Sequence, residues 1–204
     1  MIQNTETCAV PGFMANGIHA VIKENGDKDL ALVYSIVPAK ASGVFTSNCF
    51  KAAPVLLDEI RIRIKSGVAQ AVLVNSGNAN AATGQEGYQD VIAMSGSIAG
   101  KLNIDDKLVL VASTGVIGRK LPVKKITSSM QRLVKGLDLY TLPGLNEVAF
   151  GADEENINPI KDFPLPMTEP PISCTAVKIN DFILLDPCFD EEKEARIVPM
   201  KMLI

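Results

Sequence analysis

The segment Ala71-Val72-Leu73-Val74-Asn75-Ser76-Gly77-Asn78-Ala79-Asn80 indicates the fold class of this 204-residue chain. Its first four residues form a short apolar run, which is typical of a strand buried on both faces. Its last six are small polar residues around a glycine, which end the strand in a loop. A second unit follows, in which Leu108–Ala112 leads into Ser113-Thr114-Gly115-Val116-Ile117-Gly118. Two such units predict an α/β domain with its chemistry at the two strand ends.

Helices and further strands extend the pattern on both sides. Helical spacing of apolar residues predicts helices from Ala53 to a C-cap at Gly67, over residues 85–102 and over residues 124–137. Strands are expected over residues 13–23, 30–37 and 42–46, the first two joined by a hairpin at Asn25-Gly26. A last hairpin is expected from residues 172–179 and 182–186.

The composition fits a soluble globular protein: 47% of the residues are hydrophobic, 21% are charged, and the net charge is -3. No apolar run reaches the roughly 20 residues that span a bilayer. The first six residues have neither the basic nor the apolar region of a signal peptide. We therefore expect a cytoplasmic protein.

Histidine and cysteine are too few and too scattered for several kinds of site. His19 is the only histidine, and it lies in an alternating, strand-like run over residues 16–21, so a solvated or hydrogen-bonded strand histidine is favoured over a catalytic base. The four cysteines Cys8, Cys49, Cys174 and Cys188 form no C-x-x-C pair, and we expect them to be thiols in the core. These counts predict no metal site and no histidine-based triad.

The two polar loops carry the candidate site. Asn75, Ser76, Asn78 and Asn80 offer amide and hydroxyl groups with little bulk, which suits a polar ligand of amino-acid size; an Asx-rich turn that caps the next helix is the alternative. Thr114 and Gly115 could form an oxyanion hole, although a tight turn would explain them equally well. The second loop, residues 113–118, matches neither a phosphate-binding loop nor a dinucleotide fingerprint.

Several segments together resemble one family. They are Gly43–Asn48, Lys51–Val55, Asn75–Gly84, and Ser113–Gly118 followed by Leu121-Pro122. In this order they are similar to the glutamate N-acetyltransferase/ornithine acetyltransferase family, over about residues 11–135. The resemblance implies the N-terminal, α-chain part of that fold, a layered α-β-β-α sandwich of the α/β class, here with a C-terminal β-hairpin added.

The resemblance also implies an activity. Members transfer an acetyl group from N-acetylornithine, or from acetyl-CoA, to glutamate in arginine biosynthesis, and they need no cofactor. A precursor cuts itself before a threonine, and this new N-terminal threonine of the β chain is the nucleophile. The family's oxyanion hole maps to Thr114 and Gly115. No cleavage sequence occurs before Ile204, so we expect this chain to be inactive alone and to need a β chain in a hetero- or homo-oligomer.

The C-terminal part differs from the rest. We expect an acetyltransferase-like domain at residues 1–145 and a proline-rich acidic tail at residues 146–204, because residues 151–204 carry 11 acidic and 5 basic side chains. Residues 160–196 are similar to the RNase PH-like ring subunits of archaeal exosomes. The alternative function is therefore a non-catalytic binding or assembly module, related to the RNA exosome through its tail. Direct nucleic-acid binding is not expected of an acidic tail.

Overall fold

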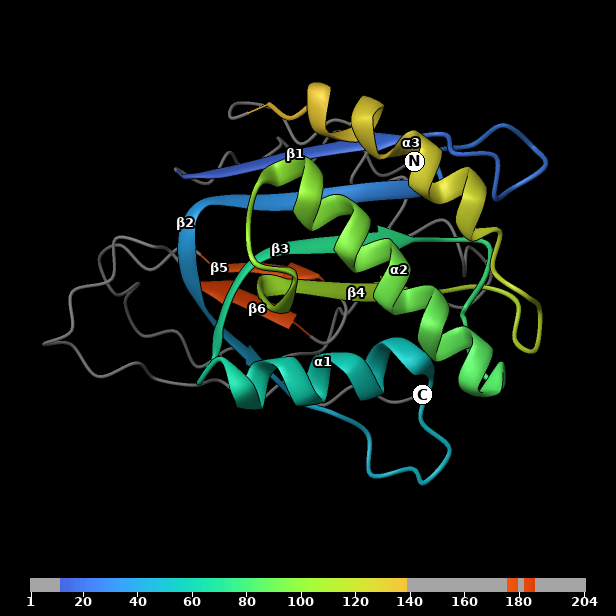
Figure 1. The fold of residues 1–204 in the computed structure, drawn as a ribbon, viewed down its shortest axis with the longest axis horizontal. Coiled ribbons are helices and arrows are strands. Elements are labelled where there is room, and N and C mark those ends of the chain that lie inside the picture. The colour runs from blue at the N-terminus through green and yellow to red at the C-terminus, as the bar shows by residue number, and fades with distance from the viewer. Residues whose placement is uncertain (1–11, 139–175, 180–181, 186–204) are drawn as a thin grey trace, which may run out of the picture.

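The computed structural model describes residues 12–138, 176–179 and 182–185 of the chain (Figure 1). These residues form alternating strands and helices with a short 3-10 turn, η1. In chain order the elements are β1 (Phe13–Ile18), β2 (Leu30–Gly43), α1 (Ala53–Ile64), β3 (Val68–Asn75), α2 (Gly84–Leu102), η1 (Asp106–Leu108), β4 (Val109–Ser113), α3 (Val123–Lys135), β5 (Ala176–Ile179) and β6 (Phe182–Leu185).

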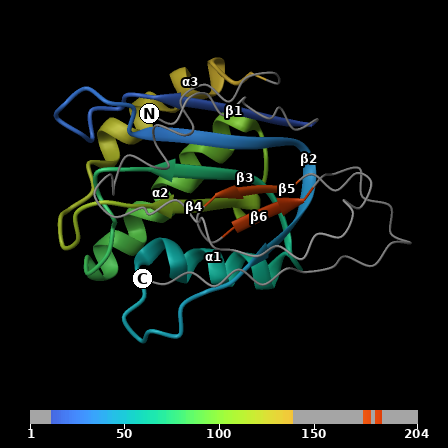
Figure 2. The same ribbon diagram turned by 180° about the vertical axis from the view of Figure 1, so that it is seen from behind.

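The strands form a sheet that β2 divides into two parts. The first half of β2 lies between β1 and β3, antiparallel to both, and β4 runs parallel to β3. The end of β2 pairs with β6, which forms an antiparallel hairpin with β5. All three helices cover one face of the β1–β4 sheet, and the view from behind shows the hairpin on the opposite face (Figure 2). The predicted α/β class is therefore confirmed.

The predicted separate strand at residues 42–46 is wrong, because β2 runs without interruption from Leu30 to Gly43. Its pairing with β3 shifts register between Tyr34 and Ala39. Pro38 lies inside this irregularity, where its missing N–H removes no ladder hydrogen bond. The sequence pattern suggested that the strand ends at Pro38, but in the structure β2 continues through Pro38 with a local shift of register.

The core has two sides, which follow the alternation of the strands. Leu30, Leu32 and Leu73 are fully buried against the helices, where they meet Val91, Met94 and Ile98 of α2 and Ile126, Met130 and Leu133 of α3. The alternate residues, among them Ala31, Val33, Val72 and Val74, form a second buried cluster on the other face of the sheet. Each fully buried large side chain of this kind contributes about 1.5–3 kcal/mol.

Two buried charged residues of α1 attach this helix to β4. The N–H of Val111 donates to both carboxylate oxygens of Asp58, at 3.0 and 3.1 Å. The guanidinium of Arg61 donates to the carbonyl of Val109 at 2.6 Å and to the Ser95 hydroxyl of α2 at 2.9 Å. Burial raises the pKa of Asp58 well above its usual value, although the Val111 N–H and Arg61 oppose the rise. Side chains of α1 thus form hydrogen bonds with main-chain groups of β4 that would otherwise pair with a further strand.

Two expectations about single residues are corrected. His19 lies just after β1 rather than in a strand, and its Nδ1 is 2.7 Å from the carbonyl oxygen of Asp27. Cys49 is exposed, not in the core, because it lies in the loop between β2 and α1. Cys8, Cys174 and Cys188 lie outside the described residues, as does most of the region similar to exosome subunits.

No helix in the described part of the chain is both long and apolar enough to cross a bilayer. The cytoplasmic location stays a prediction, and so does the division into two domains at residue 145. Of the tail, the structure describes only the two strands of the expected hairpin, and they pair as predicted, with Ile179 opposite Phe182.

Candidate functional site

The two polar loops lie together because β3 and β4 are parallel neighbours. Asn75 pairs with Ser113 at the ends of these strands, and a further bridge joins Asn78 to Val116. The Thr114 N–H donates to the Asn75 carbonyl at 3.0 Å. The connecting helix α2 makes this parallel arrangement a βαβ unit, whose strand ends are the usual place for a ligand. The structure therefore brings all six predicted site residues into one double loop.

Three asparagines hold the double loop from inside. Asn75 and Asn80 are fully buried and Asn78 is 2% exposed. The Asn75 amide donates to the Asn78 carbonyl at 2.8 Å and accepts from the Ser113 hydroxyl at 2.6 Å. These amides satisfy main-chain groups of the loop, so a contact with substrate stays a prediction.

Asn78 and Asn80 extend this network to the flanking segments. The Asn78 amide donates to the carbonyls of Arg119 and Lys120, at 3.1 and 3.2 Å. The Asn80 amide donates to the Gly87 carbonyl of α2 at 2.9 Å and accepts from the Thr83 hydroxyl at 2.8 Å. Thr83 is the N-cap of α2 but makes no side-chain capping bond to it. The Asx turn of the alternative interpretation is present, since the Asn80 N–H donates to the Asn78 amide oxygen at 2.9 Å, but the loop anchors α2 by a carbonyl contact rather than by a side-chain cap.

A contact between two glycines determines how closely the loops approach. A Cβ atom added to Gly115 would lie 2.4 Å from the carbonyl carbon of Gly77 and 2.5 Å from the Asn78 nitrogen. Gly115 also has a φ of +130°, which L side chains rarely adopt. Position 115 therefore requires glycine on both counts.

The double loop leaves two hydrogen-bond donors available at its surface. Thr114 is half-buried and Gly115 is exposed. Within the described part of the chain, the Thr114 hydroxyl and the Gly115 N–H have no acceptor, whereas the Thr114 N–H is already paired with Asn75. The Ser76 hydroxyl is buried and also has no partner among these residues. The two available donors are those that the oxyanion-hole hypothesis named.

A buried aspartate beside this loop was missed by the sequence analysis. Asp29 is fully buried, and its carboxylate accepts the N–H groups of Ala20 at 2.5 Å, Ile22 at 2.7 Å and Lys23 at 2.9 Å. Its own carbonyl accepts the Ser76 N–H at 2.9 Å. In the sequence it resembles an ordinary turn residue before a strand, so no local signal indicates this role.

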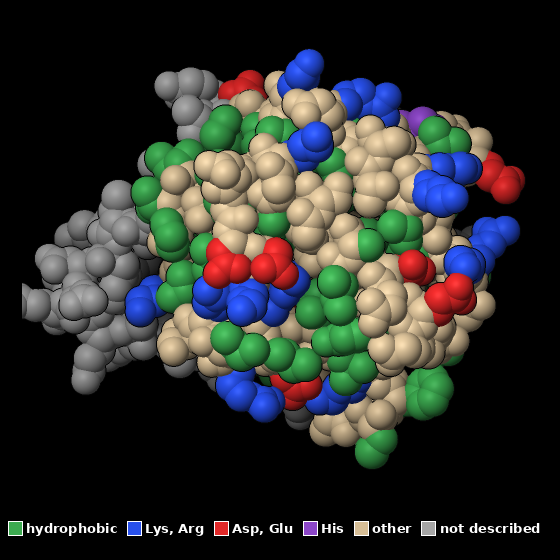
Figure 3. Space-filling view, in the orientation of Figure 1, with side chains coloured by type: hydrophobic (Ala, Val, Ile, Leu, Met, Phe, Trp, Pro, Cys, Tyr) green, Lys and Arg blue, Asp and Glu red, His purple; other side chains and the backbone are tan. Residues whose placement is uncertain are grey.

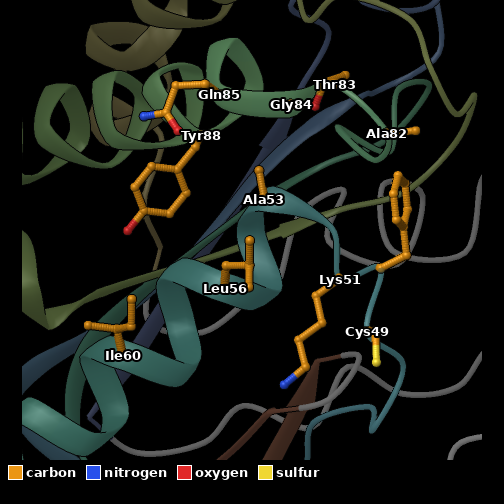
Figure 4. A pocket seen from close by; sticks show the side chains of 11 residues that line it. Cys49, Lys51, Ala53, Leu56, Ile60, Ala82, Thr83, Gly84, Gln85 and Tyr88 are labelled. Carbon is orange, nitrogen blue, oxygen red and sulfur yellow. The ribbon is translucent and has the colours of Figure 1, made fainter.

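Two hollows near the loops are formed by residues 19–125 of the described part of the chain. One of about 270 Å³ is lined by Gly77 and Asn78 together with residues 19, 21–24, 119, 120, 122 and 125. The other, of about 500 Å³, lies between α1 and the start of α2, where Leu56 and Ile60 face Gln85 and Tyr88 (Figure 4). None of the six predicted site residues lines this larger hollow.

No group of three or more histidine, cysteine or acidic residues that could hold a metal ion occurs among residues 12–138. What the site offers is hydrogen-bond donors at a rigid loop. This arrangement can stabilise a negative oxygen, but it contains no evident nucleophile with a base beside it.

Comparison with known proteins gives a consistent picture. The model of the ArgJ family matches residues 14–154. Two relatives named arginine biosynthesis bifunctional protein ArgJ are similar to this chain: that of Thermosynechococcus vestitus is 48% identical over 129 residues, and that of Streptomyces avermitilis 51% identical over 130. Each match covers 63% of this chain, and the chain spans only 30% and 33% of their lengths.

Solved structures agree with the sequence comparison. The ArgJ protein of Bacillus halodurans superposes with a TM-score of 0.62 at 37% identity, over 67% of this chain and 71% of that one. The ornithine acetyltransferase of Mycobacterium tuberculosis, solved with ornithine, gives a TM-score of 0.65 at 38% identity, over 71% of this chain and 77% of that one. The family model covers more than half of the chain, and the fold agrees, so this chain belongs to the ArgJ family.

Proposed function

We propose that this chain forms the oxyanion-binding part of an acetyltransferase site in arginine biosynthesis. The observation that carries the proposal is the pair of donors at the end of β4, the Thr114 hydroxyl and the Gly115 N–H. The contact between Gly77 and Gly115, the Thr114 N–H bond to the Asn75 carbonyl and the buried amide of Asn75 hold the backbone that carries both donors before any ligand arrives. Donors fixed in advance are what stabilises a tetrahedral oxyanion.

The nucleophile would come from a second chain, the β chain with an N-terminal threonine produced by autocatalytic cleavage. Its hydroxyl oxygen attacks the acetyl carbonyl carbon of N-acetylornithine, and its own amine takes the hydroxyl proton. The carbonyl oxygen becomes negative and accepts hydrogen bonds from Thr114 and Gly115. Collapse of this intermediate breaks the amide bond, and the proton leaves with ornithine. The amine of glutamate then attacks the carbonyl carbon of the acetyl ester, the C–O bond to threonine breaks, and a proton from that amine passes to the threonine oxygen. N-acetylglutamate leaves, and the threonine is restored.

Exposed apolar residues next to the donors support a partner at this position. Val116 and Ile117 are 53% and 68% exposed, directly after Gly115. Large apolar side chains grouped beside a candidate site are typical of a contact surface with another chain. A β chain placed there would bring its N-terminus to the donors and cover the two side chains.

Intact mass spectrometry tests the proposal. This chain is mixed with the β chain of an ArgJ protein and N-acetylornithine, and the gain of one acetyl group on the β chain is followed with time. We expect acetylation only in the mixture and no transfer to glutamate by this chain alone. Replacement of the Thr114 hydroxyl by a methyl in Thr114→Val should slow acetylation about 100-fold or more.

Thr127→Val is the matched control, because it makes the same atomic change on α3, away from the double loop. It should leave the rate unchanged. Acetylation that is equally fast with Thr114→Val would exclude the oxyanion role. No acetylation in any mixture would favour the alternative, a non-catalytic binding module.

A further inference from the structure

We propose that the hollow between residues 19–24 and residues 119–125 binds the phosphate groups of a small anion. One side of this hollow is formed by Gly77 and Asn78 of the double loop, but its test needs neither acetyl transfer nor a partner chain. The hollow has a volume of about 270 Å³, which is room for a small ligand group rather than for a whole macromolecule.

The charge of the lining is strongly positive. Four cationic side chains surround the hollow, those of Lys23, Arg119, Lys120 and Lys125, whereas Glu24 is the single acidic residue among those that line it. Lys and Arg side chains gather beside the histidine on the right edge of the molecule in Figure 3. A cleft lined by charges of one sign concentrates ions of the other sign.

Two of these cations lack an acidic partner. Lys120 forms an ion pair with Glu86. Among the residues that the structure describes, Arg119 makes no ion pair, and the Lys125 ammonium bonds only to the Val21 carbonyl, at 3.2 Å. Unmatched Arg and Lys side chains that line one hollow favour a ligand with more than one negative charge. Arg in particular provides the planar pair of donors that suits phosphate oxygens.

Both walls of the hollow are held by buried polar side chains. The Asp29 carboxylate fixes the wall of residues 20–23 through three N–H groups, although Val21 has a strained φ of +64°. The Asn78 amide fixes the opposite wall through the carbonyls of Arg119 and Lys120. The cations are therefore attached to a rigid frame, unlike lysines on a loose surface loop.

The start of α3 adds to the positive potential. Pro122 and Lys125 line the hollow at the first turn of this 13-residue helix, which has no acidic residue there and no side-chain cap. Basic residues at a helix N-terminus are normally unfavourable, because the helix dipole is positive at that end. A bound anion would reverse this penalty.

Isothermal titration calorimetry of the full chain with pyrophosphate, at constant ionic strength, tests the site. We expect saturable binding, weakened about tenfold or more in Arg119→Ala and in Lys125→Ala, because each loses a charge-assisted contact. Arg63→Ala is the control, since Arg63 is an exposed arginine of α1 and its loss changes the net charge equally. It should bind pyrophosphate like the parent chain.

A titration with glutarate distinguishes phosphate from carboxylate ligands, and we expect it to bind at least tenfold more weakly. The proposal is overturned if pyrophosphate gives no saturable binding, if Arg63→Ala weakens binding as much as Arg119→Ala, or if glutarate binds as tightly as pyrophosphate. Circular dichroism of each variant confirms that it remains folded, so that a loss of binding reports on the site.

Discussion

Removing the buried guanidinium of Arg61 should greatly destabilise the fold. In Arg61→Ala, the Val109 carbonyl loses a donor at 2.6 Å, the Ser95 hydroxyl loses one at 2.9 Å, and the longer contact to Asp106 at 3.3 Å is lost. A hydrogen bond from a charged donor contributes about 1.5–3 kcal/mol, and the buried carbonyl left without it adds to the cost. The loss also leaves the buried carboxyl of Asp58 without its nearby positive charge.

The expected decrease in the free energy of unfolding is about 4 kcal/mol, in the range for breaking a buried charged pair. This is a large part of the roughly 5–15 kcal/mol that stabilises a domain. Arg61→Lys keeps the charge but not the forked geometry, and should lose about half as much. Arg63→Ala, two residues further along the same helix but exposed, should change stability by less than about 0.5 kcal/mol.

Equilibrium unfolding in urea, followed by circular dichroism, measures all three variants against the parent chain. The urea concentration at the midpoint of unfolding should decrease least in Arg63→Ala, more in Arg61→Lys and most in Arg61→Ala. The dependence of the unfolding free energy on urea concentration should not change. If Arg61→Ala were as stable as Arg63→Ala to within about 1 kcal/mol, the buried contacts of α1 with β4 would contribute little to the stability of the fold.

Two further predictions concern Gly115 and Asp105. Gly115→Ala should lower the free energy of unfolding by at least about 2 kcal/mol, because the added Cβ would lie 2.4 Å from the main-chain carbonyl carbon of Gly77. Gly96→Ala should instead raise it by about 0.5–1 kcal/mol, because the added Cβ on α2 would meet no other atom and alanine favours the helix. Thermal melting compares the two variants. The hydrogen bond from Lys65 lowers the pKa of Asp105 from 3.8 to about 2. Its stabilising contribution is then complete above about pH 4 and is lost as the pH falls toward 2. Urea unfolding at several pH values should therefore find Asp105→Asn less stable than the parent at pH 6, by a margin that shrinks as the pH falls from 4 to 2; a difference as large at pH 2 as at pH 6 would contradict this assignment.

Periodicity in the sequence was enough to predict the three helices and the parallel strands β3 and β4, although α1 ends at Ile64 with Lys65 as its C-cap, not at Gly67. The helix expected at residues 85–102 begins at Gly84 and ends at Leu102, because its apolar stripe has to face the sheet. The strand expected at residues 71–74 extends over Val68–Asn75. In both segments, the position of a residue along the helix or strand determines whether its side chain is buried. The local pattern of apolar and polar residues is therefore enough to predict the element.

Contacts between distant residues could not be predicted in this way. The Asn16 amide of β1 donates to the Leu133 carbonyl of α3 at 2.7 Å, and Gly136 leaves room for it, since a Cβ there would lie 2.3 Å from the Asn16 nitrogen. The same is true of Asp29, which holds the segment before it. The resemblance indicated Thr114 and Gly115, whereas the basic hollow depends on two segments almost 100 residues apart, and only the fold brings them together.

The shared strand β2 has a consequence for the order in which the chain folds. Its first half pairs with β1 and β3, which are near in sequence, so these contacts close short loops. Its end pairs through Ala41 with Leu184, and a loop that long closes slowly and at a higher entropic cost. We expect the β1–β4 sheet and its helices to form first. The main-chain groups at the end of β2 then remain unpaired until the β5–β6 hairpin forms its hydrogen bonds with them.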